Sequence, residues 1–158
     1  MIADPSLADM TKALLALHVI AAIIAIGPVT VAASMFPAAA RSADAARVGL
    51  LVRICRVYAV ISVAVPVFGF ATASALHVLG SPWVLASIGL TALAAGVLGF
   101  VILPAQDRIV VTLWPAGEAP EFDPKTVTRL AMCTGIFNLL WASVTVLMIL
   151  RPGSTTGV

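Results

Sequence analysis

Long apolar stretches without a single charged residue alternate with short polar segments along this chain. No Asp, Glu, Lys or Arg occurs within residues 13–40, 57–106 or 130–150. A helix needs about 20 predominantly apolar residues to cross roughly 30 Å of hydrocarbon. The first and last stretches therefore hold one crossing each, and the middle stretch holds two crossings and a turn.

Turn-forming residues mark the limits of these predicted helices. Gly80, Ser81 and Pro82 permit a tight, uncharged hairpin in the middle stretch. Pro104 closes the third span or kinks it, and Arg151 places a cation beside the C-terminal end of the fourth. Because backbone groups in lipid must bond within their own segment, we predict an all-α fold, an integral membrane four-helix bundle with antiparallel up-down topology. The chain is then a single transmembrane domain over residues 1–158, with spans at about 11–36, 57–79, 83–103 and 128–150 and a polar loop at 105–127.

The composition supports a membrane protein. Of the 158 residues, 61% are apolar and 10% are charged, whereas an ordinary soluble domain is about one quarter charged. So few polar side chains cannot cover a surface that faces water. We therefore expect the lipid bilayer to surround most of the folded chain.

The first span has an alternative interpretation, a cleavable signal peptide. Lys12 precedes an apolar run, and the alanines at 38–40 resemble a cleavage site. However, the run is much longer than the core of a signal peptide, and Asp4 and Asp9 replace the expected basic start. We therefore expect this helix to be retained.

Basic residues are distributed unevenly between the two predicted sides of the membrane. Short loops that are rich in Lys and Arg stay in the cytoplasm. One side has only Lys12 and Arg151, and its hairpin at Gly80 has none. We therefore expect both termini to face outward and both polar loops to face inward, in a bacterial inner membrane. The inner side holds Arg41, Arg47, Arg53, Arg56, Arg108, Lys125 and Arg129.

The connection between the third and fourth spans is the largest polar segment. Its apolar piece, residues 109–114, ends in a Trp and is expected at the lipid interface. Three prolines and three acidic residues within 115–124 forbid a long helix there. A docking surface for another subunit is the alternative. Asp123 and Pro124 are then suited to cap and begin the fourth helix.

Small residues at helical spacing indicate close helix packing in the third span. Ala92 and Gly96 are four residues apart, as are Ala95 and Gly99, and small residues let helix backbones approach in lipid. The alternative is that an alanine-rich sequence produces this spacing by chance. In the fourth span, an amide near the middle is expected to bond to a neighbouring helix. The predicted packing residues are Gly89, Ala92, Gly96, Gly99 and Asn138.

Two prolines lie inside predicted spans, Pro28 in the first and Pro66 in the second. A proline inside a helix frees a backbone carbonyl and bends the helix. Such bends either open a cavity or improve packing, and both alternatives stay open.

The sequence excludes several classes of function. No carboxylate or basic residue lies in the interior of a span, which weighs against proton-coupled transport. No P-loop, Rossmann glycine pattern, Gly-x-Ser-x-Gly or His-Glu-x-x-His motif occurs, so we predict no catalytic residue. The net charge of +2 is too small to indicate nucleic-acid binding. Cys55 and Cys133 lack the spacing of a redox pair and are expected to be inert.

His18 and His77 are the titratable residues that lie well inside apolar sequence. We place His18 about two turns below the outer end of the first span and His77 in the last turn of the second, so both fall in the outer half of the membrane. Neutral imidazole binds haem iron, copper and zinc, and two facing helices can hold a b-type haem between them. The alternative is one histidine bonded to a carbonyl or hydroxyl group and the other among the lipid headgroups.

The Leu-His-hydrophobic segment at residues 17–24 resembles the opening helix of several bacterial four-helix membrane families. These are a family of predicted integral membrane proteins of unknown function, the copper-resistance D type and the haem-binding protoporphyrinogen oxidase type. The first is the most similar in length and general plan. Those families usually continue with Trp and Gly, where this chain has Ala25, Ile26 and Gly27. The matching histidine of the oxidase type is regarded as a haem ligand, and the resemblance implies that role for His18.

Three functions fit the sequence. The first is a non-catalytic accessory or assembly subunit that packs against a membrane-protein partner or another copy of the chain. The second is a haem or metal protein that uses His18, with or without His77, for electron transfer or sensing. The third is a carrier or channel for a neutral or lipidic molecule, gated by the bends at Pro28 and Pro66.

Overall fold

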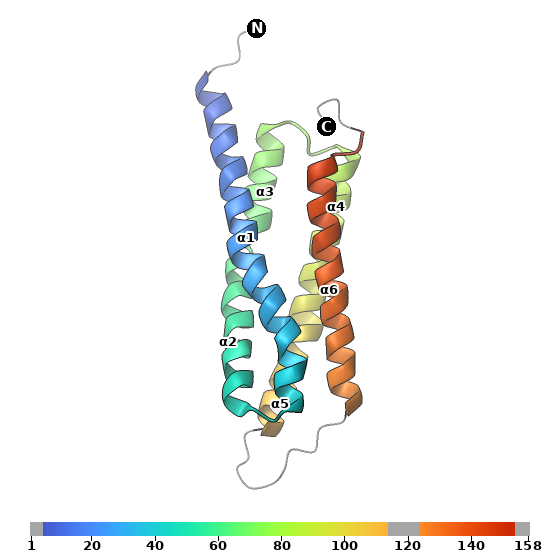
Figure 1. Cartoon of the computed structure of the whole chain (residues 1–158). Helices are drawn as coiled ribbons and strands as arrows, with labels where there is room; N and C mark the ends of the chain where they lie inside the picture. Colours follow the sequence, from blue (N-terminus) through green and yellow to red (C-terminus); the bar gives the residue numbers. More distant parts are fainter. Residues whose placement is uncertain (1–4, 114–123, 154–158) are drawn as a thin grey trace.

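The chain folds as a bundle of apolar helices (Figure 1). The computed structural model describes residues 5–113 and 124–153. The helices are α1 (Pro5–Arg41), α2 (Ala45–Ile61), α3 (Ala64–Ala75), α4 (Pro82–Gly96), the π-helical segment η1 (Val97–Ile102), α5 (Leu103–Leu113) and α6 (Pro124–Leu150). No strand occurs within these described ranges. The predicted all-α four-helix bundle is therefore confirmed.

Four helical stretches are long and apolar enough to cross a membrane, judged by length and composition. α1 forms the first, α2 with α3 the second, α4 with η1 and α5 the third, and α6 the fourth. Large apolar side chains cover the outside of the bundle, for example Phe100, which is 86% exposed, and Val60, which is 74% exposed. An outer surface of this kind is stable in lipid and unfavourable in water. The protein is a multi-pass membrane protein.

The helices pack unevenly around the bundle. α1 packs against α2, α3 and α6, and α4 packs against α6. α2 also contacts α5, whereas α3 and α4 hardly touch although a short turn connects them. Figure 1 shows the start of α1, the α3–α4 turn and the end of α6 at one end of the bundle. The bundle is therefore closed where α2 meets α5 and more open between α3 and α4.

All four helical stretches extend beyond the apolar runs that predicted them, and α1 already begins at Pro5. α2 begins at Ala45 rather than near residue 57, and the Asp44 side chain caps it by accepting a hydrogen bond from the Arg47 backbone N–H at 3.0 Å. The third stretch continues to Leu113, so residues 105–113 of the predicted polar loop are helical. α6 begins at Pro124, the residue predicted to start it. Polar helical turns at both ends of the apolar runs explain these differences, while residues 114–123 lie outside the described ranges.

The third stretch passes through Pro104 because the backbone widens just before it. In η1 the Leu103 N–H donates to the Leu98 carbonyl, five residues earlier. Proline lacks an N–H, and its ring clashes with the carbonyl four residues earlier in a regular α-helix. A π-helical turn gives that ring room. Pro104 therefore produces a local widening in place of a helix end.

The second stretch is interrupted at Ser62 and Val63, four and three residues before Pro66. The Val63 N–H donates to the Val60 carbonyl at 3.2 Å, and the Ser62 hydroxyl donates to the Ala59 carbonyl at 2.6 Å. Pro66 cannot donate to the Ser62 carbonyl, which instead accepts from the N–H three residues ahead at 3.0 Å. Pro66 thus divides this span, whereas α1 continues as one helix through Pro28.

Candidate functional site

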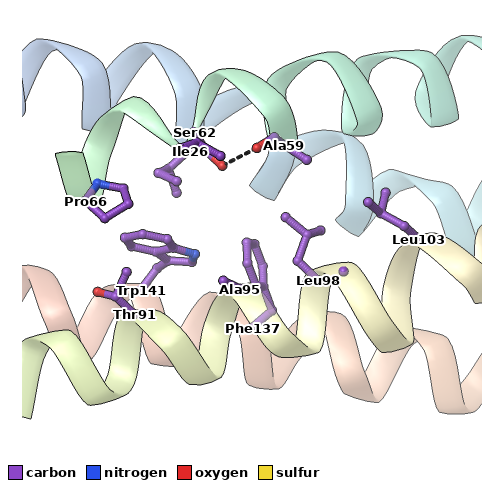
Figure 2. A pocket seen from close by; sticks show the side chains of 12 residues that line it. Ile26, Ala59, Ser62, Pro66, Thr91, Ala95, Leu98, Leu103, Phe137 and Trp141 are labelled. Carbon is purple, nitrogen blue, oxygen red and sulfur yellow. Dashed lines mark hydrogen bonds between the residues drawn. The ribbon is translucent and has the colours of Figure 1, made fainter.

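The break at Ser62 and the π-helical segment η1 line the same cavity, which has a volume of about 250 Å³. Figure 2 shows Ser62 and Pro66 facing Trp141 across it. Its walls come from all four spans: Ile26 of α1; Ala59, Ser62, Val63 and Pro66 around the break; Thr91 and Ala95 of α4; Leu98 and Gly99 of η1; Leu103 of α5; Phe137 and Trp141 of α6. Both backbone irregularities therefore meet at one place in the bundle.

The cavity is open to the surrounding lipid on one side. Val63 is 61% exposed, and Pro66, Ala95 and Gly99 are also exposed, although all four line the cavity. On the opposite side Phe137 is buried. The opening lies between the α2–α3 break and α4 with η1, on the side where α3 and α4 hardly touch. A molecule dissolved in the bilayer can reach the cavity from the side.

The chemistry of the cavity is apolar with one unused hydrogen-bond donor. No charged side chain lines it. The Trp141 ring packs against Phe137 edge to face, with centroids 6.3 Å apart. Its indole N–H is buried and has no acceptor within the described part of the chain. A buried donor without a partner costs about 1–3 kcal/mol, and a bound molecule with an acceptor oxygen would recover that loss once the indole turns its N–H toward the cavity.

His18 lies on the other side of the second span, against α3. Its Nδ1 is 2.9 Å from the Val65 carbonyl oxygen. A carbonyl only accepts, so this hydrogen bond places a proton on Nδ1. The ring lies directly on Gly69, where an added Cβ would be 2.9 Å from His18 Cε1. Glycine at this position is therefore what lets α1 and α3 approach around the imidazole.

His77 lies in the turn that follows α3. It is exposed and has a φ of 55°, and its N–H donates to the Ser74 carbonyl at 3.0 Å. The next N–H, from Val78, donates to the Ala73 carbonyl at 3.0 Å. These two bonds are typical of an α-helix that ends at a residue in the left-handed backbone conformation. His77 thus ends a helix.

The structure does not bring the two histidines together. His18 contacts α3 at Gly69, and at about 1.5 Å per residue His77 is a further 12 Å along the chain axis. A haem iron held by two histidines needs both imidazoles on opposite faces of one ring, and this pair does not fit that arrangement. Among residues 5–113 and 124–153, no group of three or more His, Cys, Asp or Glu side chains is placed to hold a metal ion. A cofactor bound by His18 alone stays a prediction.

Most of the predicted packing residues of the third span face away from the bundle. Gly89 and Ala92 are exposed, and a Cβ added at Gly89 or Gly96 would meet nothing within 4 Å. Gly99 lines the cavity. α4 instead buries the face that carries Trp83, Val84, Ser87 and Ala94. In α6, Asn138 donates from Nδ2 to the Ser34 hydroxyl of α1 at 3.0 Å.

Both cysteines are free, Cys55 buried and Cys133 half-buried. Cys55 Sγ is 3.5 Å from the Gln106 amide nitrogen, at the contact between α2 and α5. Gln106 is fully buried, and its carbonyl oxygen has no partner in the described structure. On the exposed side of the same contact, Arg56 forms an ion pair with Asp107. These contacts hold the closed end of the bundle together.

Comparisons with known proteins give no match, because no family model, curated protein or solved structure matches this chain. The resemblance of residues 17–24 to four-helix membrane families therefore stays a prediction. Function has to be argued from the cavity and from the side chains around it.

Proposed function

We propose that this protein binds a neutral lipidic molecule in the cavity between the α2–α3 break and η1, and carries it within the membrane. The observation behind this proposal is that the two backbone irregularities of the bundle line one apolar cavity that opens to lipid. π-Helical turns inside α-helices are frequent at functional sites. An irregular backbone that served only packing would not need to enclose a space.

The lining selects the chemical class of the guest. A charged molecule would lose its hydration without gaining a partner, because no charged side chain lines the cavity. The free Trp141 N–H favours a guest with an ester, ketone or ether oxygen. Ligand sites usually have volumes of about 300–1,000 Å³. A cavity of about 250 Å³ therefore accepts a ring or one segment of a chain, and the remainder extends through the opening into lipid.

The backbone also gives the site a means of opening. The hydrogen bonds at Val63 and Val65 run three residues back, and the Ser62 hydroxyl satisfies the carbonyl that the break releases. α3 is held mainly by α1 and hardly by α4. Segments with few tertiary contacts open most easily, so we expect the guest to enter and leave between α3 and α4 while α3 stays against α1.

Fluorescence quenching tests this proposal. In a variant with Trp83→Phe and Trp114→Phe, Trp141 is the remaining tryptophan. The neutral probe is the methyl ester of a doxyl-labelled stearic acid, added to liposomes that contain the protein. We expect saturable quenching of Trp141 fluorescence, because a site fills at limited probe content.

Matched substitutions on α4 provide the control. Ala95→Leu fills the cavity and should remove the saturable quenching, whereas Ala92→Leu, one turn away and outside the cavity, should leave it unchanged. Quenching that rises in proportion to probe content, or that is equal in both variants, means that bulk lipid fills the space and refutes the proposal.

The outward face of α4 favours a second candidate, an accessory or assembly subunit. Gly89, Ala92 and Gly96 form a small-residue face that packs against no other helix of the described chain. Such faces let transmembrane helices associate closely. Gly96→Leu should then weaken co-purification of a membrane-protein partner or self-association without lowering the melting temperature of the isolated chain. Unchanged association in native membrane extracts would exclude this role for the face.

A further inference from the structure

A second cavity, of about 190 Å³, lies between α1 and α6 near the end of α1. It is lined by Ser34 and Arg41 of α1 and by Thr134 and Asn138 of α6, among others. Ser34 and Arg41 are exposed, whereas Thr134 is only 2% exposed. The cavity is therefore a groove that opens to lipid and has buried polar groups on its inner wall.

Two side chains that line the groove each carry a polar atom with no partner in the described structure. These atoms are Thr134 Oγ1 and Asn138 Oδ1, and each is buried from solvent. The orientation of the amide is fixed by its neighbour. Ser34 donates its hydroxyl proton to the Thr30 carbonyl at 2.7 Å, so its oxygen must accept from Asn138 Nδ2 at 3.0 Å. Asn138 Oδ1 is consequently an acceptor that needs a donor, and the Thr134 hydroxyl is free to donate.

One hydroxyl group satisfies both atoms. Residues four apart on a helix lie on one face with Cβ atoms about 6 Å apart. Once both side chains turn toward the groove, a hydroxyl between Thr134 and Asn138 accepts from the first and donates to the second. A single water could do this, but a water occupies about 30 Å³ of liquid volume, and the groove is several times larger. The groove therefore has room for a larger guest.

Arg41 adds a positive charge at the end of the groove that lies near the membrane surface. It lies in the last turn of α1, about 10 Å along the axis from Ser34. No carboxylate lines the groove, so nothing there opposes an anion. Arg guanidinium groups bind phosphate with two hydrogen bonds. The groove thus combines a phosphate-binding cation with a hydroxyl-binding pair deeper in the membrane.

We propose that this groove binds an anionic lysophospholipid. Arg41 pairs with the phosphate, the free glycerol hydroxyl bridges Thr134 and Asn138, and the single acyl chain leaves through the open side into the bilayer. A diacyl phospholipid carries no free hydroxyl on its glycerol backbone, so it leaves both buried atoms unsatisfied. This inference is independent of the proposed function, because the two cavities share no lining residue.

Native mass spectrometry of the full chain in detergent tests the proposal, with lysophosphatidic acid as the probe. We expect it to bind more tightly than diacyl phosphatidic acid, which has no free hydroxyl on its glycerol. Arg41→Gln should weaken binding of the lyso form about tenfold, as expected for a lost charge-assisted bond. Thr134→Val should weaken it about fivefold and leave the diacyl form unaffected, whereas Thr134→Ser, which keeps the hydroxyl, should restore tight binding.

Two controls distinguish lipid binding in the groove from general attraction to the protein surface and from binding of a soluble phosphate. Arg53→Gln removes an exposed arginine of α2 that does not line the groove and should leave binding unchanged. An equal loss in Arg53→Gln and Arg41→Gln would show general surface attraction and overturn the proposal. Equal binding of lysophosphatidic acid by the original chain and Thr134→Val would also overturn it. So would binding of free glycerol 3-phosphate at the same concentration, because the site would then recognise a soluble phosphate.

Discussion

His18 donates its Nδ1 proton to the Val65 carbonyl of α3 at 2.9 Å, and its ring fills the space left open by Gly69. The contact joins the first span to the second just beyond the helix break. It therefore fixes α3 against α1 while leaving α3 almost free of α4.

Gly69→Ala should destabilise the protein. The new Cβ would lie 2.9 Å from His18 Cε1, and overpacking of this kind costs about 1–3 kcal/mol. The melting temperature of the purified protein in detergent measures the effect. Gly49→Ala is the matched control, because a Cβ there meets nothing within 4 Å and alanine is the better helix former.

The double variant His18→Ala, Gly69→Ala identifies the cause of this destabilisation. If His18 is what the new Cβ meets, His18→Ala should remove most of the additional loss caused by Gly69→Ala, because the two sites are coupled. Equal melting temperatures for Gly69→Ala and Gly49→Ala would contradict the packing described for this contact.

Pro66→Ala should strengthen the second span and weaken binding in the cavity. An N–H at position 66 can donate to the Ser62 carbonyl, and an interior proline costs a helix up to about 3 kcal/mol. We expect a higher melting temperature together with reduced saturable quenching of Trp141. Pro28 does not line the cavity and lies in a continuous helix, so Pro28→Ala should not change quenching. Unchanged quenching in Pro66→Ala would show that the helix break does not contribute to binding in the cavity.

Gln106→Met should be neutral or stabilising by up to about 1 kcal/mol. The amide is fully buried, its oxygen has no partner in the described structure, and its nitrogen has only the 3.5 Å contact with Cys55. Methionine fills a similar volume without a polar group that must be satisfied. Thermal unfolding compares it with Gln106→Ala, which should be clearly destabilising because it leaves a cavity. A strong loss of thermal stability in Gln106→Met would contradict this expectation and reveal a polar role for this amide.

Labelling of single cysteines tests the orientation inferred from the basic residues. In a background with Cys55→Ala and Cys133→Ala, Gly80→Cys lies in the α3–α4 turn and Ser42→Cys in the α1–α2 turn, and both positions are exposed. A membrane-impermeant maleimide should label position 80 on intact cells and position 42 only after lysis. The reverse pattern would place the termini inside.

The sequence predicted the number of spans because charge-free runs long enough to cross lipid leave few alternatives. Their ends were less accurate, since α2 continues into a turn that carries Arg47 and α5 continues past Asp107. Helices at a membrane surface keep their backbone hydrogen bonds while their side chains become polar. Counting apolar residues therefore finds the crossing and misses the polar turns.

The cavity could be predicted only in part. Pro66 and Pro104 each mark a helix irregularity one turn earlier, and both prolines are visible in the sequence. That the two irregularities face one another depends on how the second and third spans rotate, and hydropathy carries little information about rotation in a uniformly apolar helix. For the same reason the sequence does not identify Trp141 as a cavity residue. The predicted pairing of His18 with His77 rested only on their similar depth in the membrane.

The most direct test of the central claim is native mass spectrometry of the protein extracted gently from its own membrane. We predict that one neutral lipidic molecule per chain stays bound to the original protein and to Ala92→Leu, and is lost from Ala95→Leu. Protein that carries no such molecule, or an Ala95→Leu variant that retains it, would contradict the assignment of the cavity as the binding site.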